Sequence, residues 1–536
     1  MSPDADQAPA SRVSILTRSA TRRTIAARGL SATLEVLPMS PRSRAPMALL
    51  SVLSAAVLVI VAAIGVTRSP ATGAPPAGEG RGGPVAAASD NPELAEQQET
   101  TDQRNEAFAA AKAAGKTGQV RPANAKPSAG WVGEVPYDTT WDDWEPAIAA
   151  DPHAPYVYAL TTRYGAPKPC PGNCPSPWIA LEVSADNGAT WTQSRPLCAC
   201  KGSGQFDPII EVVPNTCDVY SLFMIGFNVW FIKSTDHGLH WTDPVQTYGN
   251  VAWNDKPIIA VSDDGRNVYA AFNGPTGGDP WIAQSHDAGV TWSQSKIIDS
   301  GQYVYAFDGD VASDGTVYFS ESALTYPNAG KAAGVAGPID HHVFVSRDGG
   351  KSWEDDLVAT VQPGIVCVAV GCKGDFYVGH TALSVDAAGG VVLLYDGAKT
   401  SGGLQTIEAR RSGDKGATWS GPVTLSKVGE ESTAPAIESG AAGDVRAWYY
   451  QTSGGGNVDA WNIWYRRSAD GGATWAAPVK LSDATSGAAY KTAAGFLEVY
   501  GDYGELAITN TGKSIAIWGE GISYTGPGGV WFNREP

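Results

Sequence analysis

Six copies of one eight-residue phrase run through the last two-thirds of the chain. Each copy reads Ser-x-Asp-x-Gly-x-(Thr/Ser/His)-Trp, and the aspartates of the copies are Asp186, Asp236, Asp287, Asp348, Asp414 and Asp470. Successive aspartates are 50, 51, 61, 66 and 56 residues apart, which is about the length of one four-stranded blade. The repeat therefore predicts an all-β chain that folds as a β-propeller of four-stranded blades.

The chemistry of the repeat suits a tight turn between two strands. A short aspartate side chain accepts hydrogen bonds from nearby backbone N–H groups, and glycine takes the positive φ that such a turn needs. The tryptophan supplies a large apolar ring for packing between blades. With these six turns, residues 131–536 resemble the sialidase-like superfamily of β-propellers, whose repeat is known as the Asp box or BNR repeat. We expect the six aspartates to be structural.

The number of blades follows from how the modules open. Seven short apolar strands begin in a similar way, near Glu145, Asp207, Lys256, Gly309, Thr381, Ala434 and Gly504. The last module has no repeat, and a strand at about residues 131–135 would complete it and close the ring. We predict seven blades, with six as the alternative.

The N-terminal part divides into three segments before the propeller at 131–536. Residues 1–44 are basic, and residues 45–67 contain twenty uncharged residues at 47–66, enough to cross a bilayer as a retained signal-anchor or to serve as a cleaved signal peptide. Residues 68–130 are rich in Ala, Gly and Pro and predict a flexible linker. We therefore expect an extracellular propeller, secreted or anchored to the cell membrane by its N-terminal segment.

Net charge limits the classes of binding partner, and the cysteines predict disulfide bonds. The formal net charge is −17, which disfavours binding to nucleic acid and to anionic lipid. We expect contact with a membrane only through the N-terminal segment. We also expect a monomer. All seven cysteines lie after residue 169, and export predicts disulfides. Cys367 and Cys372 are expected to close a small loop, whereas the five cysteines at 170–217 must leave one unpaired within that group.

Strand order predicts where a ligand would bind. In an up-and-down blade, the loops that join strand two to three and strand four to the next strand one share a face opposite the repeats, and these loops are the long ones here. Polar residues recur where each innermost strand begins, at the mouth of the central channel. Gathered carboxylates raise one another's pKa values, so that some serve as acids and others as bases. The alternative for each residue alone is that it caps a turn or joins neighbouring blades.

The candidate site residues follow from this placement. The candidate catalytic residues are Asp143, Asp207, Asp255, Asp308 and Tyr503. The candidate substrate-binding residues are Arg163, His380, Trp141, Trp144, Trp253, Asp310 and Asp502. No metal-ligand set is predicted.

The resemblance implies a chemistry that the chain matches only in part. Sialidases grip the substrate carboxylate with three arginines, and they use an Asp for proton transfer and a Tyr activated by a Glu. Here the Arg-Ile-Pro signature ahead of the first repeat is missing, and Arg163 is the one arginine clearly placed in a face loop. The sequence predicts a glycoside hydrolase that acts on carbohydrate without a cofactor, rather than an exo-sialidase. The alternatives are a glycan- or protein-binding adhesion propeller, and an acidic mouth that holds Ca²⁺, as a structural ion or for a lyase reaction.

Overall fold

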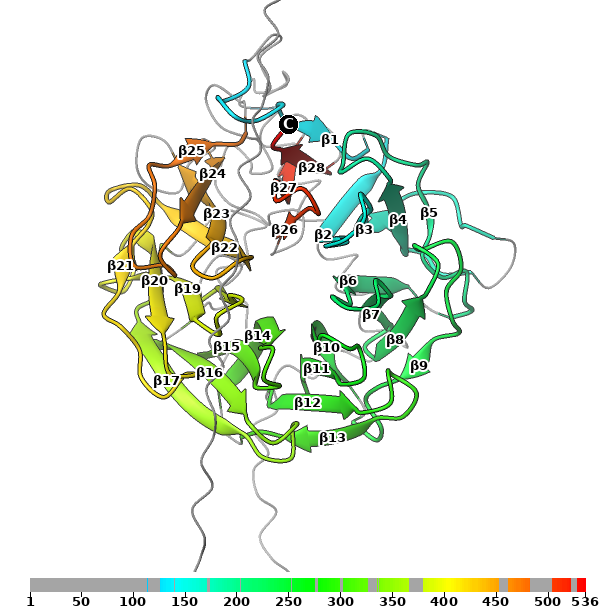
Figure 1. The fold of residues 1–536 in the computed structure, drawn as a ribbon, viewed down its shortest axis with the longest axis horizontal. Helices are drawn as coiled ribbons and strands as arrows, with labels where there is room; N and C mark the ends of the chain where they lie inside the picture. The colour runs from blue at the N-terminus through cyan, green and yellow to red at the C-terminus, as the bar shows by residue number, and fades with distance from the viewer. Residues whose placement is uncertain are drawn as a thin grey trace, which may run out of the picture. The chain divides into compact units, whose positions relative to one another are not determined.

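The computed structural model describes residues 113, 126–138, 140–170, 174–202, 204–251, 253–274, 278–298, 302–325, 335, 337–365, 379–452, 461–482, 504–521 and 528–536. Twenty-eight β-strands occur among them, in seven four-stranded antiparallel sheets. The sheets are arranged as blades around one axis (Figure 1). The predicted fold, an all-β propeller with seven blades, is confirmed.

Each blade has one strand at each of four distances from the axis. The innermost strands are β2 (Asp142–Ala150), β6 (Gln205–Val212), β10 (Asp255–Val261), β14 (Tyr303–Val311), β18 (Thr381–Val385), β22 (Ser432–Ser439) and β26 (Glu505–Ile508). The second strands are β3 (Val157–Tyr164), β7 (Val219–Ile225), β11 (Val268–Asn273), β15 (Val317–Leu324), β19 (Val391–Ala398), β23 (Val445–Thr452) and β27 (Ser514–Gly521). The third strands are β4 (Trp178–Ser184), β8 (Val229–Ser234), β12 (Pro280–Ser285), β16 (Ile339–Ser346), β20 (Gln405–Ser412), β24 (Trp461–Ser468) and β28 (Gly528–Arg534). The outermost strands are β5 (Arg195–Pro196), β9 (Val245–Gln246), β13 (Ser293–Lys296), β17 (Glu354–Val361), β21 (Val423–Thr424), β25 (Val479–Lys480) and β1 (Val135–Pro136).

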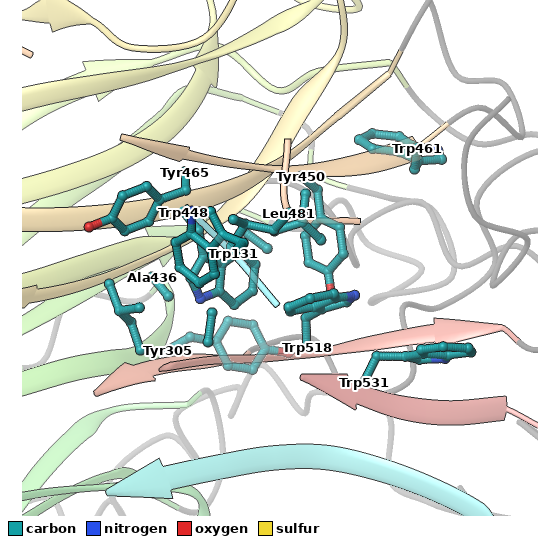
Figure 2. Packing of buried hydrophobic residues seen from close by; sticks show 14 of the residues in the cluster. Trp131, Tyr305, Ala436, Trp448, Tyr450, Trp461, Tyr465, Leu481, Trp518 and Trp531 are labelled. Atoms are coloured by element: carbon teal, nitrogen blue, oxygen red, sulfur yellow. The ribbon is translucent and has the colours of Figure 1, made fainter. Parts of the chain in front are cut away.

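The ring closes by combining the two ends of the propeller in one blade. Strand β1 pairs with β28, with Val135 opposite Phe532, so the predicted N-terminal strand does complete the last module. Just before it, Trp131 packs edge-on against Tyr465, with ring centroids 5.0 Å apart. Figure 2 shows Trp131 among the aromatic side chains of β23, β24, β27 and β28. The closure is therefore held by apolar burial as well as by strand pairing.

The six repeats form the turns between third and fourth strands. In the first copy, the Ser184 hydroxyl donates to Asp186 Oδ1, and the backbone N–H groups of Gly188 and Thr190 donate to Ser184 Oγ and Asp186 Oδ1, each over 2.8 Å. The same three bonds recur in the other copies. These carboxylates are satisfied by their own turns, as a structural role requires.

Four innermost strands carry the same irregularity near their start. Glu145, Asp207, Lys256 and Ala434 have φ of 53°, 47°, 51° and 45°, each directly before a proline, and the strand register shifts there. Positive φ is costly for residues that have a Cβ. A strained bulge that recurs at one end of the ring marks this end as a candidate for function.

The described cysteines form two short-range disulfides, Cys170–Cys174 and Cys198–Cys200. Cys217 is free, so the prediction of one unpaired cysteine in this group is confirmed. Cys367 and Cys372 lie outside the described residues, as does the predicted membrane segment at 45–67. Where the structure does describe the chain, it contains no helix of the length and apolar character needed to cross a membrane.

Candidate functional site

The end of the ring axis at which the innermost strands begin is called the mouth below. The repeats lie at the other end, because each third strand runs parallel to the first strand of its blade. Of the predicted residues, Asp143, Asp207 and Asp255 lie at the starts of β2, β6 and β10, Arg163 at the end of β3, and His380 directly before β18. Asp308 and Asp310 lie further along β14. Asp502 and Tyr503 lie outside the described residues.

Asp143 and Arg163 neutralise each other in the protein interior. Arg163 donates from Nε to Asp143 Oδ1 over 2.8 Å and from a terminal nitrogen to Oδ2 over 2.9 Å. Its guanidinium lies 5.5 Å from the ring centroid of Trp178. The side chains are 3% and 0% exposed, so a ligand at the mouth does not reach either charge. Desolvation raises the pKa of Asp143, and the hydrogen bonds from Arg163 act in the opposite direction.

Carboxylates on the innermost strands also join neighbouring blades. Asp308 Oδ2 accepts a bond from the backbone N–H of Leu383 on β18, at 2.9 Å. Asp310 Oδ2 does the same with Val385, at 2.8 Å. Two further pairs of this kind among the described residues are Glu145 with the N–H of Asp207, and Glu505 with the N–H of Ile148. These contacts show the blade-joining role that was the alternative to catalysis, although Asp308 and Asp310 remain partly exposed.

Five carboxyl groups of four innermost strands have raised pKa values. Desolvation, with Asp310 adding repulsion, raises the pKa of Asp308 to about 8. Desolvation also raises the pKa of Asp310 to about 6 and that of Glu211 to about 8. The pKa values of Glu438 and Glu505 are raised well above the usual range by the same causes. At neutral pH Asp308 and Glu211 therefore hold their protons, whereas Asp310 is mostly ionised.

Aromatic rings border the mouth. Trp144 lies 5.3 Å from Tyr164, and Trp253 lies 5.0 Å from Phe227, between ring centroids. Trp141 packs beside the small apolar cluster that contains Trp178. On β14, alternate residues present Tyr303, Tyr305 and Phe307 in a row, with centroid separations of 4.8 and 6.2 Å. Partly exposed rings beside polar groups are the surface on which sugar rings stack.

Asp255 opens β10 beside two polar neighbours. Its Oδ1 accepts a bond from the Lys256 N–H over 3.0 Å, and Lys256 Nζ lies 5.8 Å from the centroid of the Tyr305 ring. Opposite Asp255 in the sheet is Asn273. Asn273 is 1% exposed, and within the described part of the chain neither atom of its amide has a hydrogen-bond partner. A buried, unpaired amide costs free energy, so a polar partner at this point of the mouth would stabilise the fold.

His380 belongs to a group built around Asp396 at the end of β19. The N–H groups of Gly379 and His380 donate to Asp396 Oδ1 over 2.7 and 3.0 Å. Gly379 permits this with a φ of +78°. Asp396 Oδ2 lies 3.1 Å from His380 Nδ1 and accepts a bond from the Thr433 hydroxyl over 2.8 Å. Asp396 is fully buried and His380 nearly so, so the imidazole is held in one orientation at the mouth.

A second histidine supports the same aspartate. His341 Nδ1 pairs with the Ser322 hydroxyl over 2.8 Å, and its Nε2 pairs with the backbone carbonyl of Asp396 over 3.1 Å. Burial lowers the pKa of His341 to about 4, so this ring is neutral. Its tautomer then follows from its partners: Nε2–H donates to the carbonyl, and Nδ1 accepts from Ser322.

The arginines gather away from the mouth. Residues 131–536 contain ten, all described: Arg163, Arg195, Arg266, Arg347, Arg410, Arg411, Arg446, Arg466, Arg467 and Arg534. Only Arg163 lies at the mouth end, and it is paired with Asp143. The others lie on strands that lead to the repeats, on turns at that end, or near the C-terminus. The ten arginines of residues 131–536 therefore do not form a trio for a substrate carboxylate at this mouth.

Sequence reasoning missed the residues that gain their role from the ring. Asp396, His341, Glu211, Glu438 and Glu505 were not predicted. Glu211 and Glu438 do share the pattern of a carboxylate three or four residues after an X-Pro opening, which is a usable signal. In the described part of the chain, no group of three His, Cys, Asp or Glu side chains is placed to hold a metal ion.

Several solved structures resemble this chain weakly. No protein-family model matches the chain, and no curated protein matches it in sequence. Among solved structures, a protein of unknown function from Dyadobacter fermentans matches with 14% identity and a TM-score of 0.42, over 76% of this chain and 99% of that chain. The NanB sialidase of Streptococcus pneumoniae matches with 11% identity and a TM-score of 0.39, over 77% and 70%. An ulvan lyase matches with 11% identity and a TM-score of 0.45, over 74% and 95%. A sialidase is among these matches, as the resemblance of the repeats predicted.

Proposed function

We propose that this propeller is a carbohydrate-active enzyme that hydrolyses glycosidic bonds at the mouth. The observation that carries the proposal is the meeting, at one end of the ring, of ionisable groups and aromatic rings, of which Tyr303 and Phe307 are partly exposed. Aromatic rings favour stacking with sugar rings, and glycoside hydrolysis needs an acid and a base on opposite sides of the bond. The resemblance of the six repeats to those of sialidase-like propellers supports the substrate class.

Asp308 is the carboxyl group of the predicted pool best suited to serve as the acid. It is partly exposed, and its pKa of about 8 keeps it protonated at neutral pH. A general acid with a pKa near the working pH transfers its proton efficiently to a leaving oxygen. Asp143, by contrast, is engaged by Arg163 in the interior.

The substrate would not be recognised as a sialidase recognises sialic acid, because an arginine trio is not formed at the mouth. We therefore favour neutral or weakly charged glycans. A sialoside is the informative negative control in a substrate panel. A substrate whose cleavage depends on a sialic acid carboxylate would contradict this part of the proposal.

The test is turnover by the full chain on neutral, uronic-acid and sialylated glycans. New reducing ends report hydrolysis, and absorbance of an unsaturated uronate reports elimination instead. Asp308→Asn is expected to lower kcat about 100-fold or more. Asp314→Asn is the matched control, because Asp314 is an exposed aspartate of the same blade, at the repeat end. Glycan binding without any cleavage by the wild-type chain would refute the enzyme and leave a binding module.

A further inference from the structure

His380 presents one ring nitrogen that the fold does not use. Its Nδ1 faces Asp396 Oδ2 at 3.1 Å. Among the described residues, Nε2 has no hydrogen-bond partner, and it is not one of the fully buried unpaired atoms. The ring lies against Phe307 of β14, with centroids 5.0 Å apart. Nε2 is therefore the part of this group that a ligand at the mouth can meet.

The network around Asp396 fixes which nitrogen carries the proton. Asp396 accepts five bonds or close contacts, from the N–H groups of Gly379, His380 and Ala434, the Thr433 hydroxyl and His380 Nδ1. A carboxylate accepts a hydrogen bond from each donor that faces it. It therefore holds the hydrogen of neutral His380 on Nδ1 and leaves a lone pair on Nε2. The same anion would stabilise the imidazolium once Nε2 takes a proton.

We propose that His380 is the general base of this enzyme and that Asp396 is its positioning residue; this rests on the proposed hydrolytic function. His380 Nε2 takes a proton from the attacking water, whose oxygen bonds to the anomeric carbon. The bond from that carbon to the leaving oxygen breaks, its electron pair goes to the oxygen, and the carboxyl of Asp308 supplies the proton. His380 then releases its proton to solvent, and Asp308 takes one up.

Most glycoside hydrolases use two carboxyl groups as acid and base, whereas here the base is a histidine. Its parts come from adjacent blades: Asp308 lies on β14, where it bonds to the backbone of β18, and His380 directly precedes β18. A further link joins the same two blades, since the Thr381 hydroxyl donates to Ser320 Oγ over 3.0 Å. These bonds fix the base relative to the acid, as catalysis by positioned groups requires.

Among the residues that the structure describes, few charged and titratable groups surround His380. Asp396 faces it from β19, and the uncharged Thr433 and Phe307 face it from β22 and β14. Further out, His341 contacts the Asp396 carbonyl. Glu431 interacts with Asp396, and desolvation raises its pKa to about 8. Both outer groups are neutral near pH 7.

The test uses the full chain and a glycan that the wild type cleaves. In His380→Ala, kcat is expected to fall about 100-fold or more with little change in KM, and added imidazole is expected to restore part of it. The matched control is His153→Ala, an exposed histidine at the repeat end, which should keep kcat and show no response to imidazole. Asp396→Asn should lower kcat without rescue. Thermal unfolding of each variant identifies loss of folding, and His380→Gln gives a second variant of similar size.

Each failure points to a different error. A wild-type chain that cleaves no glycan refutes the proposed function and this assignment with it. If the wild type cleaves a glycan and both His380→Ala and His380→Gln keep the wild-type kcat, the general-base role alone is overturned. A folded variant that is inactive but not rescued by imidazole also overturns it. Nitrogen NMR of the imidazole needs no substrate: hydrogen on Nδ1 is expected, and hydrogen only on Nε2 would refute the orientation.

Discussion

Burial decides what each acidic residue near the mouth does. Asp143 is fully buried against Arg163, and removing either partner of such a pair would leave the other charge buried and unpaired. Asp308 keeps some exposure and has a pKa of about 8, which leaves a proton available for transfer. The two aspartates begin from the same chemistry. Their neighbours across the sheet, a guanidinium for one and backbone N–H groups for the other, separate their roles.

The buried pair predicts a large stability change at one residue. Arg163→Leu removes the partner of a carboxylate that is 0% exposed, so the free energy of unfolding should fall by about 3–5 kcal/mol. Arg467→Leu is the control, because Arg467 also pairs with an aspartate but is 47% exposed and should cost less than about 1 kcal/mol. Denaturant unfolding at pH 7 measures both. Equal losses would show that burial of the pair is not what matters.

Two kinds of element mark the two ends of the ring. The repeats form self-contained turns at one end, and the strained X-Pro openings lie at the other. A turn satisfied by its own side chains is robust and free of ligand duties. A bulge re-aims side chains and interrupts pairing, which suits the end that carries the candidate site.

The repeat turn predicts a sharp contrast between two glycines. Gly289 of the third copy has a φ of +82°, and an added Cβ would overlap the Phe231 ring of the neighbouring blade. Gly413 of the fifth copy has nothing within 4 Å of such a Cβ. Gly289→Ala should therefore cost about 3 kcal/mol or more, from strain and overpacking together, whereas Gly413→Ala should stay within about 0.5 kcal/mol. Thermal unfolding compares the two, and similar midpoints would contradict the packing of β8 on this turn.

The elements could be predicted from the sequence better than the site. The spacing of six repeats and seven openings predicted seven blades, because each blade repeats one local chemistry. The partner of Asp143 could not be read in the same way, since its pairing with Arg163 depends on the strand register beside a bulge. Asp396 lies 16 residues from His380, across one strand pair, and its role depends on donors from β22 that only the folded ring supplies.

At the scale of the whole molecule, the ring places acids from distant parts of the chain around one axis. Glu211, Asp308 and Asp310, Glu438 and Glu505 lie on the innermost strands of four blades, and repulsion among them adds to desolvation in raising their pKa values. The repeat aspartates behave in the opposite way. Hydrogen bonds from Thr291 lower the pKa of Asp287 to about 2, for example. The molecule therefore has two sets of acids: the inner set has raised pKa values, and the repeat aspartates have lowered ones.

These two sets predict how stability depends on pH. An inner carboxyl with a folded pKa of about 8, such as that of Glu211, holds a proton that the unfolded chain releases near its ordinary pKa. The folded state therefore binds more protons between about pH 4.5 and 8, and stability should fall as pH rises through that window. Below about pH 4 the repeat aspartates, with a pKa of about 2 for Asp287, reverse the sign, so the thermal midpoint of the full chain should be highest near pH 4–5.

Glu438→Gln removes one inner ionisation and should raise the midpoint at pH 8 more than at pH 5. Glu354→Gln, on the outermost strand β17 and 63% exposed, should leave the difference between the two midpoints unchanged. A midpoint that rises from pH 5 to pH 8 in the wild type would mean that the inner carboxyls are ionised together, and the choice of Asp308 as a protonated acid would fall with it.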